Sequence, residues 1–224
     1  MQIKVELKDH MGSDLTTVNA ARVSFDKESE WGFADWREGK LYLKDSDEKL
    51  INYLAKHKHF TPFGHSFMSF RVTAPVFVRA QLVKHEYLRM NEISRRYVDS
   101  EPEFYFPSKW RKRAENVKQG SSDEFFEGAL EKQTNYSYEV FIADAINLYN
   151  EYIDDGMAPE QARMVLPQSM MTSWWWSGSL DAFAKMCKLR LDPHAQYETR
   201  IVAEEINKIA SGLFPVSWRA LIEI

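Results

Sequence analysis

The sequence predicts a mixed fold of helices and strands, because stretches of both periodicities follow one another along the chain. Residues 3–8 (IKVELK) and 66–72 (SFMSFRV) alternate in polarity as strands do. Residues 46–57 and 123–155 instead carry apolar side chains at helical spacing. No linker, repeat or low-complexity tract divides the 224 residues, so we expect a single domain over residues 1–224, with or without an appended helical layer.

Each remaining element is assigned from a local signal, such as a capping residue, a proline or a terminal glycine. We expect a helix over 15–22 capped by Asp14, a helix from Pro75, a short helix over 159–166, a helix over 180–190 after its cap Ser179, and a last helix over 194–211. We expect helix 123–155 to be interrupted near Thr134 and Asn135. Between the helices we expect an irregular excursion over 26–44, an extended segment over 91–97 and a strand-like segment over 101–108.

Composition limits the class of protein. The net charge is only −4, so basic clusters are local features and favour small anions over long polyanions as ligands. Cys187 is the only cysteine, which excludes an internal disulfide and fits a reducing compartment; we expect it to be a buried thiol. The first residues lack the apolar centre of a signal peptide, and no run reaches the roughly 18 apolar residues of a membrane span. A cytoplasmic location is the expectation.

Three local clusters leave alternatives open. His57, His59 and His65 surround a turn that could bind a ligand or serve the fold; no zinc spacing is present, and we expect no metal. The run 109–113 (KWRKR) reads as a solvated loop, as a patch guiding phosphorylated ligands, or as a nucleic-acid contact. Consecutive tryptophans at 174–176 cannot all face one core, so they are candidates to wall a site for flat rings.

The stretch 75–97 (PVFVRAQLVKHEYLRMNEISRRY) is the strongest functional signal. It concentrates cationic and hydrogen-bonding side chains that suit an anionic ligand: Arg79, Lys84, His85, Arg89, Arg95, Arg96, Gln81, Asn91, Glu92 and Ser94. Arg163 lies inside an apolar helical turn, so its guanidinium either extends to solvent or binds an anion. Arg190 ends a helix just before a break that contains Pro193, so its guanidinium can project into the junction between two helices. The sequence contains no phosphate-binding loop, no nucleophile-elbow motif of hydrolases and no zinc-protease motif. An arginine-rich pocket without an obvious nucleophile suits a bound cofactor that carries out the chemistry.

The run 84–97 (KHEYLRMNEISRRY) resembles the signature of the flavin-dependent thymidylate synthases, in which Arg-His-Arg and a serine are separated by seven residues within a Ser-x-Asn-Glu-x-Ser-x-Arg-Tyr context. His85 and Ser94 have the matching separation. Further resemblance lies in MGSDLTTVNAARVSFD, HFTPFGHSFMSFRVTAPVFV, EFYFPS, ARMVLP and LRLDPHAQYE, in family order over nearly the whole chain.

This resemblance implies an α+β fold with a mixed or antiparallel sheet flanked by helices, assembled as a homotetramer whose active sites are shared between subunits. It implies reductive methylation of dUMP to dTMP, with 5,10-methylenetetrahydrofolate as carbon donor and FAD, reduced by NADPH, as hydride carrier. Two other activities stay open: flavin- and folate-dependent hydroxymethylation of a deoxynucleotide, and non-catalytic binding of nucleotides or nucleic acid.

The resemblance also assigns residues. Arg190 and Ser94 would be catalytic, with Arg190 favouring the ionised N3 of the pyrimidine. The dUMP contacts would be Gln81, Lys84, Glu92, Ser94, Arg95, Arg96, Arg163 and Arg190, with Arg163 and Arg96 on the phosphate. The FAD contacts would be His59, Thr61, Lys84, His85, Glu86, Arg89, Glu92, Ser179, Leu180, Asp181, Lys185 and His194.

The chain departs from the family pattern at the expected flavin contacts. Lys84 stands in place of the first arginine of the Arg-His-Arg triplet, which keeps the positive charge. Glu86 stands in place of the last arginine, which exchanges a cation for an anion. Arg89 stands where serine is usual, and could restore the lost charge. Gly64 replaces a common glutamate, and Ser179 and Lys185 replace common asparagines. The nucleotide site is therefore better supported than the flavin site.

Overall fold

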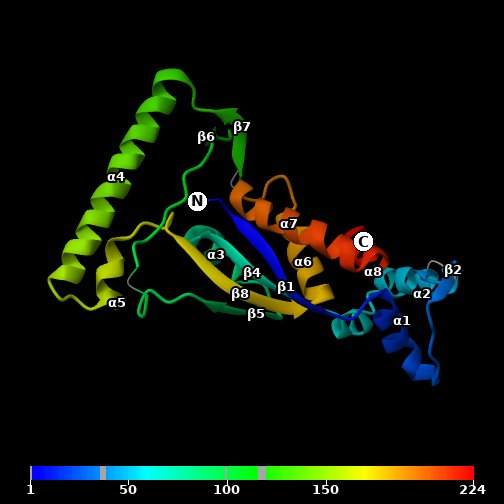
Figure 1. The fold of residues 1–224 in the computed structure, drawn as a ribbon. Coiled ribbons are helices and arrows are strands. Elements are labelled where there is room, and N and C mark those ends of the chain that lie inside the picture. The colour runs from blue at the N-terminus through cyan, green and yellow to red at the C-terminus, as the bar shows by residue number, and fades with distance from the viewer. Residues whose placement is uncertain (1, 36–38, 99, 116–119) are drawn as a thin grey trace.

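The computed structural model describes residues 2–35, 39–98, 100–115 and 120–224. Its centre is a four-stranded antiparallel sheet with strand order β1-β4-β8-β5 (Figure 1). The bounds of its strands are Lys4–Met11 for β1, Phe67–Pro75 for β4, Leu88–Glu92 for β5 and Met171–Ser179 for β8. Helices flank this sheet, so the predicted α+β class is confirmed.

The tryptophan run lies in β8, an interior strand that pairs with β4 along its whole length. Side chains alternate across a strand, so Trp174 and Trp176 face the core, each 1% exposed, while Trp175 lies on the other face, 48% exposed. The reasoning that three consecutive rings cannot share one core was correct. The sequence analysis did not anticipate a strand here, because three bulky rings hide the alternation that identifies one.

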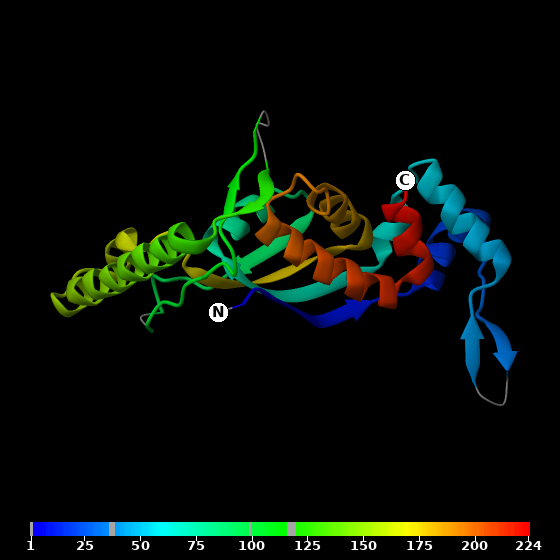
Figure 2. The same ribbon diagram turned by 90° about the horizontal axis from the view of Figure 1, so that it is seen from above.

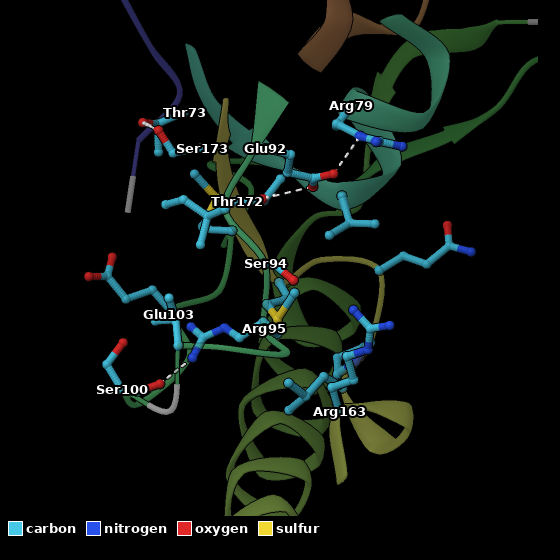
Figure 3. Close-up of a pocket in the computed structure, with 18 of the residues that line it drawn as sticks. Thr73, Arg79, Glu92, Ser94, Arg95, Ser100, Glu103, Arg163, Thr172 and Ser173 are labelled. Carbon is cyan, nitrogen blue, oxygen red and sulfur yellow. Dashed lines mark hydrogen bonds and ion pairs between the residues drawn. The ribbon is translucent and has the colours of Figure 1, made fainter. Parts of the chain in front are cut away.

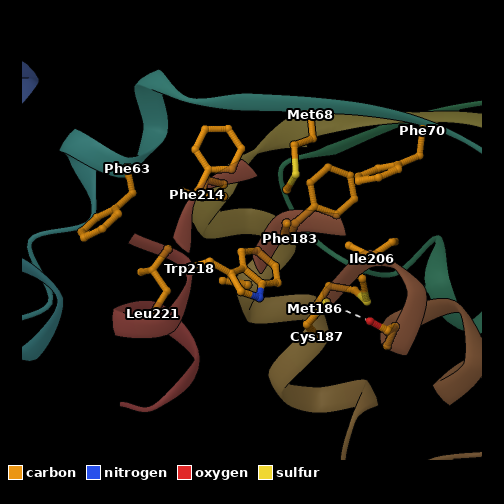
Figure 4. Close-up of a cluster of buried hydrophobic side chains, with 14 of the residues drawn as sticks. Phe63, Met68, Phe70, Phe183, Met186, Cys187, Ile206, Phe214, Trp218 and Leu221 are labelled. Carbon is orange, nitrogen blue, oxygen red and sulfur yellow. Dashed lines mark hydrogen bonds between the residues drawn. The ribbon is translucent and has the colours of Figure 1, made fainter. Parts of the chain in front are cut away.

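One face of the sheet is covered by the helices α6 (Leu180–Arg190), α7 (Tyr197–Leu213) and α8 (Pro215–Ile222) (Figure 2). Their apolar side chains share one buried cluster with those of β4 and β8. The rings of Phe70 and Phe183, drawn in Figure 4, meet edge to face. Their centroids are 5.1 Å apart. Cys187 is buried in this layer and burial raises the pKa of its thiol, as expected of a structural cysteine. The helix expected over 194–211 begins at Tyr197, and α8 was not anticipated.

The helices α1 (Asp14–Arg22) and α2 (Asp45–Lys56) lie toward one end of the sheet and confirm the expected helices there (Figure 1). Short 3₁₀ turns follow at Val23–Phe25 and, in the histidine-rich segment, at Thr61–His65. Asp14 does not cap its own helix, because Ser13 is the N-cap. The Asp14 carboxylate is 3% exposed and instead accepts hydrogen bonds from the backbone N–H groups of Val216 and Ser217, at 3.0 and 2.7 Å.

Two hairpins replace segments expected to be irregular or helical. The first, β2 (Gly32–Asp35) with β3 (Lys40–Tyr42), lies in the expected excursion, of which residues 36–38 are outside the described part. The second joins β6 (Arg111–Arg113) to β7 (Ser121–Phe125), so the KWRKR run belongs partly to a strand. The segment 101–108 forms only an isolated bridge between Phe104 and Met170.

Helix α4 (Gly128–Asp154) projects from the body and is followed by α5 (Pro159–Ala162) and a 3₁₀ turn, Arg163–Val165 (Figure 1). Its expected start at residue 123 was wrong, because Phe125 pairs with Arg111 in the hairpin. The expected interruption is also absent. Thr134 donates its hydroxyl to the carbonyl of Leu130 at 2.8 Å, a bond compatible with the helix.

The stretch 75–97 divides earlier than expected. Helix α3 spans Val76–Leu82, and β5 ends at Glu92. The carbonyl of Ser94 then accepts bonds from the N–H groups of Tyr97 and Val98, at 3.0 and 3.1 Å, which closes a turn. The expected extended segment over 91–97 was therefore wrong beyond residue 92. Among the described residues, no helix has the length and hydropathy needed to cross a membrane.

Candidate functional site

A cavity of about 820 Å³ opens where β4, β8 and the end of β5 meet the 3₁₀ turn at residue 163; we call it the arginine pocket (Figure 3). Its polar lining includes Arg71, Thr73, Arg79, Glu92, Ser94, Arg95, Ser100, Glu101, Glu103, Arg163, Gln168, Thr172 and Ser173. Four of the sequence-predicted substrate residues, Glu92, Ser94, Arg95 and Arg163, are thus brought together from segments about 70 positions apart in sequence.

Within this pocket, Glu92 is held from two sides. Its Oε2 lies 2.8 Å from Nε of Arg79, and its Oε1 accepts a hydrogen bond of 2.9 Å from the hydroxyl of Thr172. An ionised carboxylate can accept about four hydrogen bonds, so Glu92 keeps capacity for a ligand N–H or O–H. Its orientation is set by the protein before any ligand binds.

The guanidinium groups of Arg95 and Arg163 contact backbone carbonyl oxygens, so their positive charges can serve a ligand. Arg95 donates to the carbonyl of Ser100, and Arg163 donates from Nε to the carbonyl of Glu160 at 3.3 Å. Within the described residues, neither guanidinium forms an ion pair with a carboxylate. Arg96, expected beside Arg163 on a phosphate, instead pairs with the Glu160 carboxylate at 3.4 Å, where both side chains are about half exposed. Glu160 therefore links the two arginines.

A second cavity, of about 520 Å³, lies at the end of α6; we call it the Arg190 pocket. Its lining residues are Gln81, Arg111, Gly120, Ser121, Arg190, His194, Ala195 and Gln196. Nε of Arg190 donates to Nε2 of His85 at 2.9 Å, and Nη2 lies 3.5 Å from the carbonyl oxygen of Gln81. The guanidinium is thus oriented while its other N–H groups stay available.

His85 is neutral in this arrangement. Burial, followed by the positive charge of Arg190, lowers the pKa of His85 from 6.5 to about 4. Because its Nε2 accepts the Arg190 bond, the ring proton of the neutral form is carried by Nδ1. The histidine of the sequence signature and the distant arginine therefore act as one unit.

Several expected flavin contacts gather around the first turn of α6. Lys185 pairs with Asp181 at 3.1 Å, and Asp181 also accepts the hydroxyl of Ser179 at 2.6 Å. The Lys185 ammonium lies 4.9 Å from the ring centroid of Phe60 and 5.9 Å from that of Tyr87. This group, the Lys185 cluster, combines a cation with two aromatic faces next to the segment of His59 and Thr61.

Tyr87 has a backbone conformation that marks it out. Its φ of 62° lies in the left-handed region, which is costly for a bulky side chain, and its ring is 74% exposed. The neighbouring strand explains the path of the chain: a Cβ at Gly178 would lie 2.4 Å from Leu88 Cδ2 and 3.0 Å from the Tyr87 carbonyl oxygen. Only glycine at 178 permits this close approach.

The structure does not unite all the expected site residues in one place. Six of the eight substrate candidates divide between the arginine pocket and the Arg190 pocket, which share no lining residue among those described; Lys84 and Arg96 are in neither lining. His194, expected at the flavin, lines the Arg190 pocket. Lys84, Glu86 and Arg89 are exposed, whereas Leu180 is fully buried, so its side chain packs in the core and only its backbone can face a ligand.

Sequence reasoning missed several pocket residues. Arg71, Thr73 and Ser173 line the arginine pocket, where Arg71 Nε donates to the hydroxyl of Ser173 at 3.1 Å. Arg71 alternates with the buried residues Phe70 and Val72, so the period of the strand could have placed it on the outer face. Arg111 and Gln196 of the Arg190 pocket lie in the highlighted runs 109–113 and 189–198, but neither was assigned a role of its own. No group of metal-ligating side chains occurs in the described residues.

Comparisons with known proteins show which sequences and structures this chain resembles. The family model described as thymidylate synthase complementing protein matches residues 6–216. The flavin-dependent thymidylate synthase of Thermus thermophilus is 37% identical over 220 residues, covering 98% of this chain and 75% of that protein. The corresponding enzyme of Kosmotoga olearia is 34% identical and covers 99% and 94%.

Solved structures are similar as well. The crystal structure of the UMP/dUMP methylase PolB from Streptomyces cacaoi bound with 5-Br dUMP superposes with a TM-score of 0.84 at 30% identity, over 100% of this chain and 96% of that one. The same methylase bound with 5-Br UMP gives a TM-score of 0.81 at 29% identity, over 99% and 94%.

Proposed function

Because the chain belongs to the family of flavin-dependent thymidylate synthases, we propose that it catalyses the reductive methylation of dUMP to dTMP. The carbon comes from 5,10-methylenetetrahydrofolate, and FAD reduced by NADPH supplies the hydride that completes the methyl group. The observation that carries the proposal is the arginine pocket, where Arg95 and Arg163 line one cavity with Ser94 and a pre-oriented Glu92.

In this pocket, Arg163 and Arg95 hold the nucleotide phosphate, because planar guanidinium groups donate two parallel hydrogen bonds to phosphate oxygens. Arg96 joins them when its exposed pair with Glu160 opens, which costs little because surface ion pairs are weak. Ser94 donates its hydroxyl to the nucleotide, and Glu92 accepts from its polar groups. Arg71 lines the same cavity and adds positive charge, whereas the charge of Arg79 is compensated by Glu92.

Arg190 activates the pyrimidine. A fixed guanidinium beside the ring stabilises the negative charge that develops when N3 is ionised, which makes C5 nucleophilic. Its orientation is set by neutral His85, whose Nε2 accepts from Arg190 Nε. Cys187 cannot attack the ring, because it is buried in the helical layer.

The residues of the Lys185 cluster fit a flavin dinucleotide. Lys185 offers a positive charge for the pyrophosphate, and the rings of Phe60 and Tyr87 offer faces for the flat ring systems. His59, Thr61 and Ser179 supply hydrogen bonds from the adjacent segments. Glu86 is exposed and can turn away from the phosphates. FAD bound here supplies hydride transfer, while the protein positions the nucleotide.

We further propose a homotetramer in which the arginine pocket of one subunit and the Arg190 pocket of another form each active site. The support is that six of the eight substrate candidates lie in two cavities that have no described lining residue in common. Two inactive variants, Arg163→Ala and Arg190→Ala, test this. The two variants are mixed, unfolded together and refolded. The mixture should regain part of the wild-type turnover, because some active sites then contain an intact arginine pocket from one subunit and an intact Arg190 pocket from another. No recovery in verified mixed tetramers would refute shared sites.

Turnover itself is tested with purified protein, FAD, NADPH, methylenetetrahydrofolate and dUMP under anaerobic conditions, with products separated by mass. We expect dTMP and one oxidised NADPH for each methyl group. Hydroxymethyl-dUMP as the main product would assign the chain to the alternative reaction. Absence of both products, with dUMP bound, would indicate a non-catalytic nucleotide binder.

UMP is a second candidate substrate. The observation that favours it is the structural similarity to a methylase that was crystallised with both 5-Br dUMP and 5-Br UMP. A parallel assay in which UMP replaces dUMP measures the ratio of the two kcat/KM values. A ratio near one would show that the site ignores the 2′-hydroxyl group.

A further inference from the structure

The β6–β7 hairpin, to which the proposed function gives no role, contacts the start of α7 through Arg111. Nη2 of Arg111 lies 2.8 and 2.9 Å from the two carboxylate oxygens of Glu198, and Nε donates to the hydroxyl of Ser121 at 2.8 Å. Its guanidinium also lies 4.8 Å from the ring centroid of Tyr197. Figures 1 and 2 both show the hairpin beside this end of α7.

Glu198 is a buried anion that depends on this contact. The residue is 4% exposed, and a carboxylate removed from water stays ionised only where a cation and hydrogen bonds compensate the lost hydration. Arg111 supplies the cation. The Arg111–Glu198 pair joins two segments 87 residues apart, so the hairpin is fixed to α7 at the wall of the Arg190 pocket.

The charge of Glu198 sets the direction of a chain of amide hydrogen bonds. An ionised carboxylate only accepts, so Gln196 presents its Nε2 to Glu198, at 3.2 Å. The Oε1 of Gln196 then faces Gln81 and accepts a bond from Gln81 Nε2. On its other side, Gln81 Oε1 accepts from the hydroxyl of Thr199 at 3.3 Å. Each amide in the chain therefore has one possible orientation.

This chain leaves a defined pattern at Gln81. Its Nε2 has one N–H left to donate and its Oε1 has one lone pair left to accept. Gln81 lines the Arg190 pocket together with Arg190, and Nη2 of Arg190 lies 3.5 Å from the backbone carbonyl oxygen of Gln81. A flipped amide would exchange donor and acceptor at the pyrimidine. At position 4, uracil carries an acceptor oxygen whether or not N3 is ionised, whereas cytosine carries a donor amino group, so the two bases differ by such an exchange.

We propose that Arg111 is a positioning residue for base selection: through Glu198 and Gln196 it fixes the Gln81 amide in the orientation that matches uracil and mismatches cytosine. The inference rests on the proposed function, because it takes Gln81 to contact the pyrimidine of dUMP. It assigns individual roles to Arg111, Glu198 and Gln196, which lie in the runs 109–113 and 189–198 but received no role of their own from the sequence.

Two substitutions break the directional chain while keeping its shape. Glu198→Gln is isosteric, and its amide can donate or accept, so the Gln196 and Gln81 amides become free to flip. Arg111→Met keeps an unbranched side chain but removes the cation that pairs with Glu198 and fixes its carboxylate. Arg111→Lys keeps that charge and should preserve the orientation. Lys112→Ala, the next residue of β6 with an exposed pair to Glu124, is the matched control.

The measurement is the dissociation constant of the flavin-loaded protein for dUMP and for dCMP by calorimetry, with flavin affinity measured separately by fluorescence. We expect Glu198→Gln and Arg111→Met to weaken dUMP binding about tenfold, since one oriented hydrogen bond is lost. Binding of dCMP should be unchanged or tighter, so the preference for dUMP falls. Arg111→Lys and Lys112→Ala should keep the wild-type preference, and flavin affinity should be the same in all variants.

A merely structural role gives a different result. If the variants lose dUMP, dCMP and flavin binding together, or keep the wild-type preference, the positioning role of Arg111 is refuted. Wild-type protein that binds flavin but no dUMP would instead refute the proposed function, and the base-selection role with it. The two failures are therefore distinguished by the wild-type protein alone.

Discussion

Nε of Arg190 donates to Nε2 of His85 at 2.9 Å, which joins the last residue of α6 to the turn after α3. The pair connects the centre of the sequence signature to a residue 105 positions away. Its consequence is that the cation expected to activate the pyrimidine has a fixed direction, because its Nε is already engaged by a neutral acceptor.

Replacing Arg190 with alanine should abolish methylation while flavin stays bound. The lost interaction acts on charge that develops during the reaction, so kcat should fall by about two to three orders of magnitude. Steady-state kinetics and the flavin absorption of the purified variant provide the test. Lys188→Ala, an exposed position on the same helical turn, is the control, and near-normal turnover of Arg190→Ala would rule out the assigned role.

His85 should titrate well below an ordinary histidine. Nuclear magnetic resonance of the imidazole should give a midpoint near pH 4, and His85→Asn identifies the signal. Replacement of Arg190 by methionine should raise this pKa only part of the way toward 6.5, because burial is the larger cause. A midpoint unchanged by that replacement would show that the two groups are not coupled in solution.

The same shift has a defined effect on stability. Between pH 4 and 6.5 the unfolded chain binds more protons at His85 than the folded protein does. The contribution of neutral His85 is therefore complete above about pH 6.5 and is lost as the pH falls toward 4. Denaturant unfolding across this window should show a shallower pH dependence for His85→Asn than for wild type.

Glu86 should weaken flavin binding, since it places a negative charge where the family has arginine. Glu86→Arg should tighten FAD binding about twofold to fivefold, the range expected of an exposed charge. Added salt should reduce the gain. Fluorescence titration of flavin-free protein measures the effect, and Glu223→Arg, an exposed residue of the last turn, controls for net charge. Weaker binding by Glu86→Arg would mean that Glu86 itself contacts the flavin.

Asp14→Ala should destabilise the fold without changing ligand affinity. The substitution leaves the buried N–H groups of Val216 and Ser217 without their acceptor, at an expected cost of about 1–3 kcal/mol. For a chain of this length, each kcal/mol lowers Tm by about 2–4 °C. Calorimetry should detect this, whereas Asp144→Ala, exposed on α4, should leave Tm unchanged. Equal Tm values for both variants would refute a stabilising role of the Asp14 bonds.

The sequence predicted most of what local signals determine. Helices at 46–57 and 180–190 have caps and periodic apolar faces, and the structure contains them. The pairing of β8 with β4 was missed, because three tryptophans concealed the alternation. The start of α4 was misplaced because Phe125 satisfies both a helical and a strand pattern, and only its partner Arg111 decides between them.

For the site, the motif and the resemblance pointed to Ser94, Arg163 and Arg190, and the fold places the first two in one cavity. The residues proposed to orient Gln81 could not be found in the same way. Arg111 and Glu198 lie in runs that the sequence highlighted only as a whole, and their individual significance comes from a contact between segments 87 residues apart. Such contacts depend on the complete fold, not on local pattern.

The bonds from Asp14 to the start of α8 also constrain the order of folding. The carboxylate and its partner Ser217 are separated by 203 residues, so this loop closes only after nearly all of the chain is available. During synthesis, α1 can form early, but its buried acid has to wait for the last helix. A nascent chain still attached to the ribosome should therefore remain sensitive to proteolysis around α1 until α8 emerges.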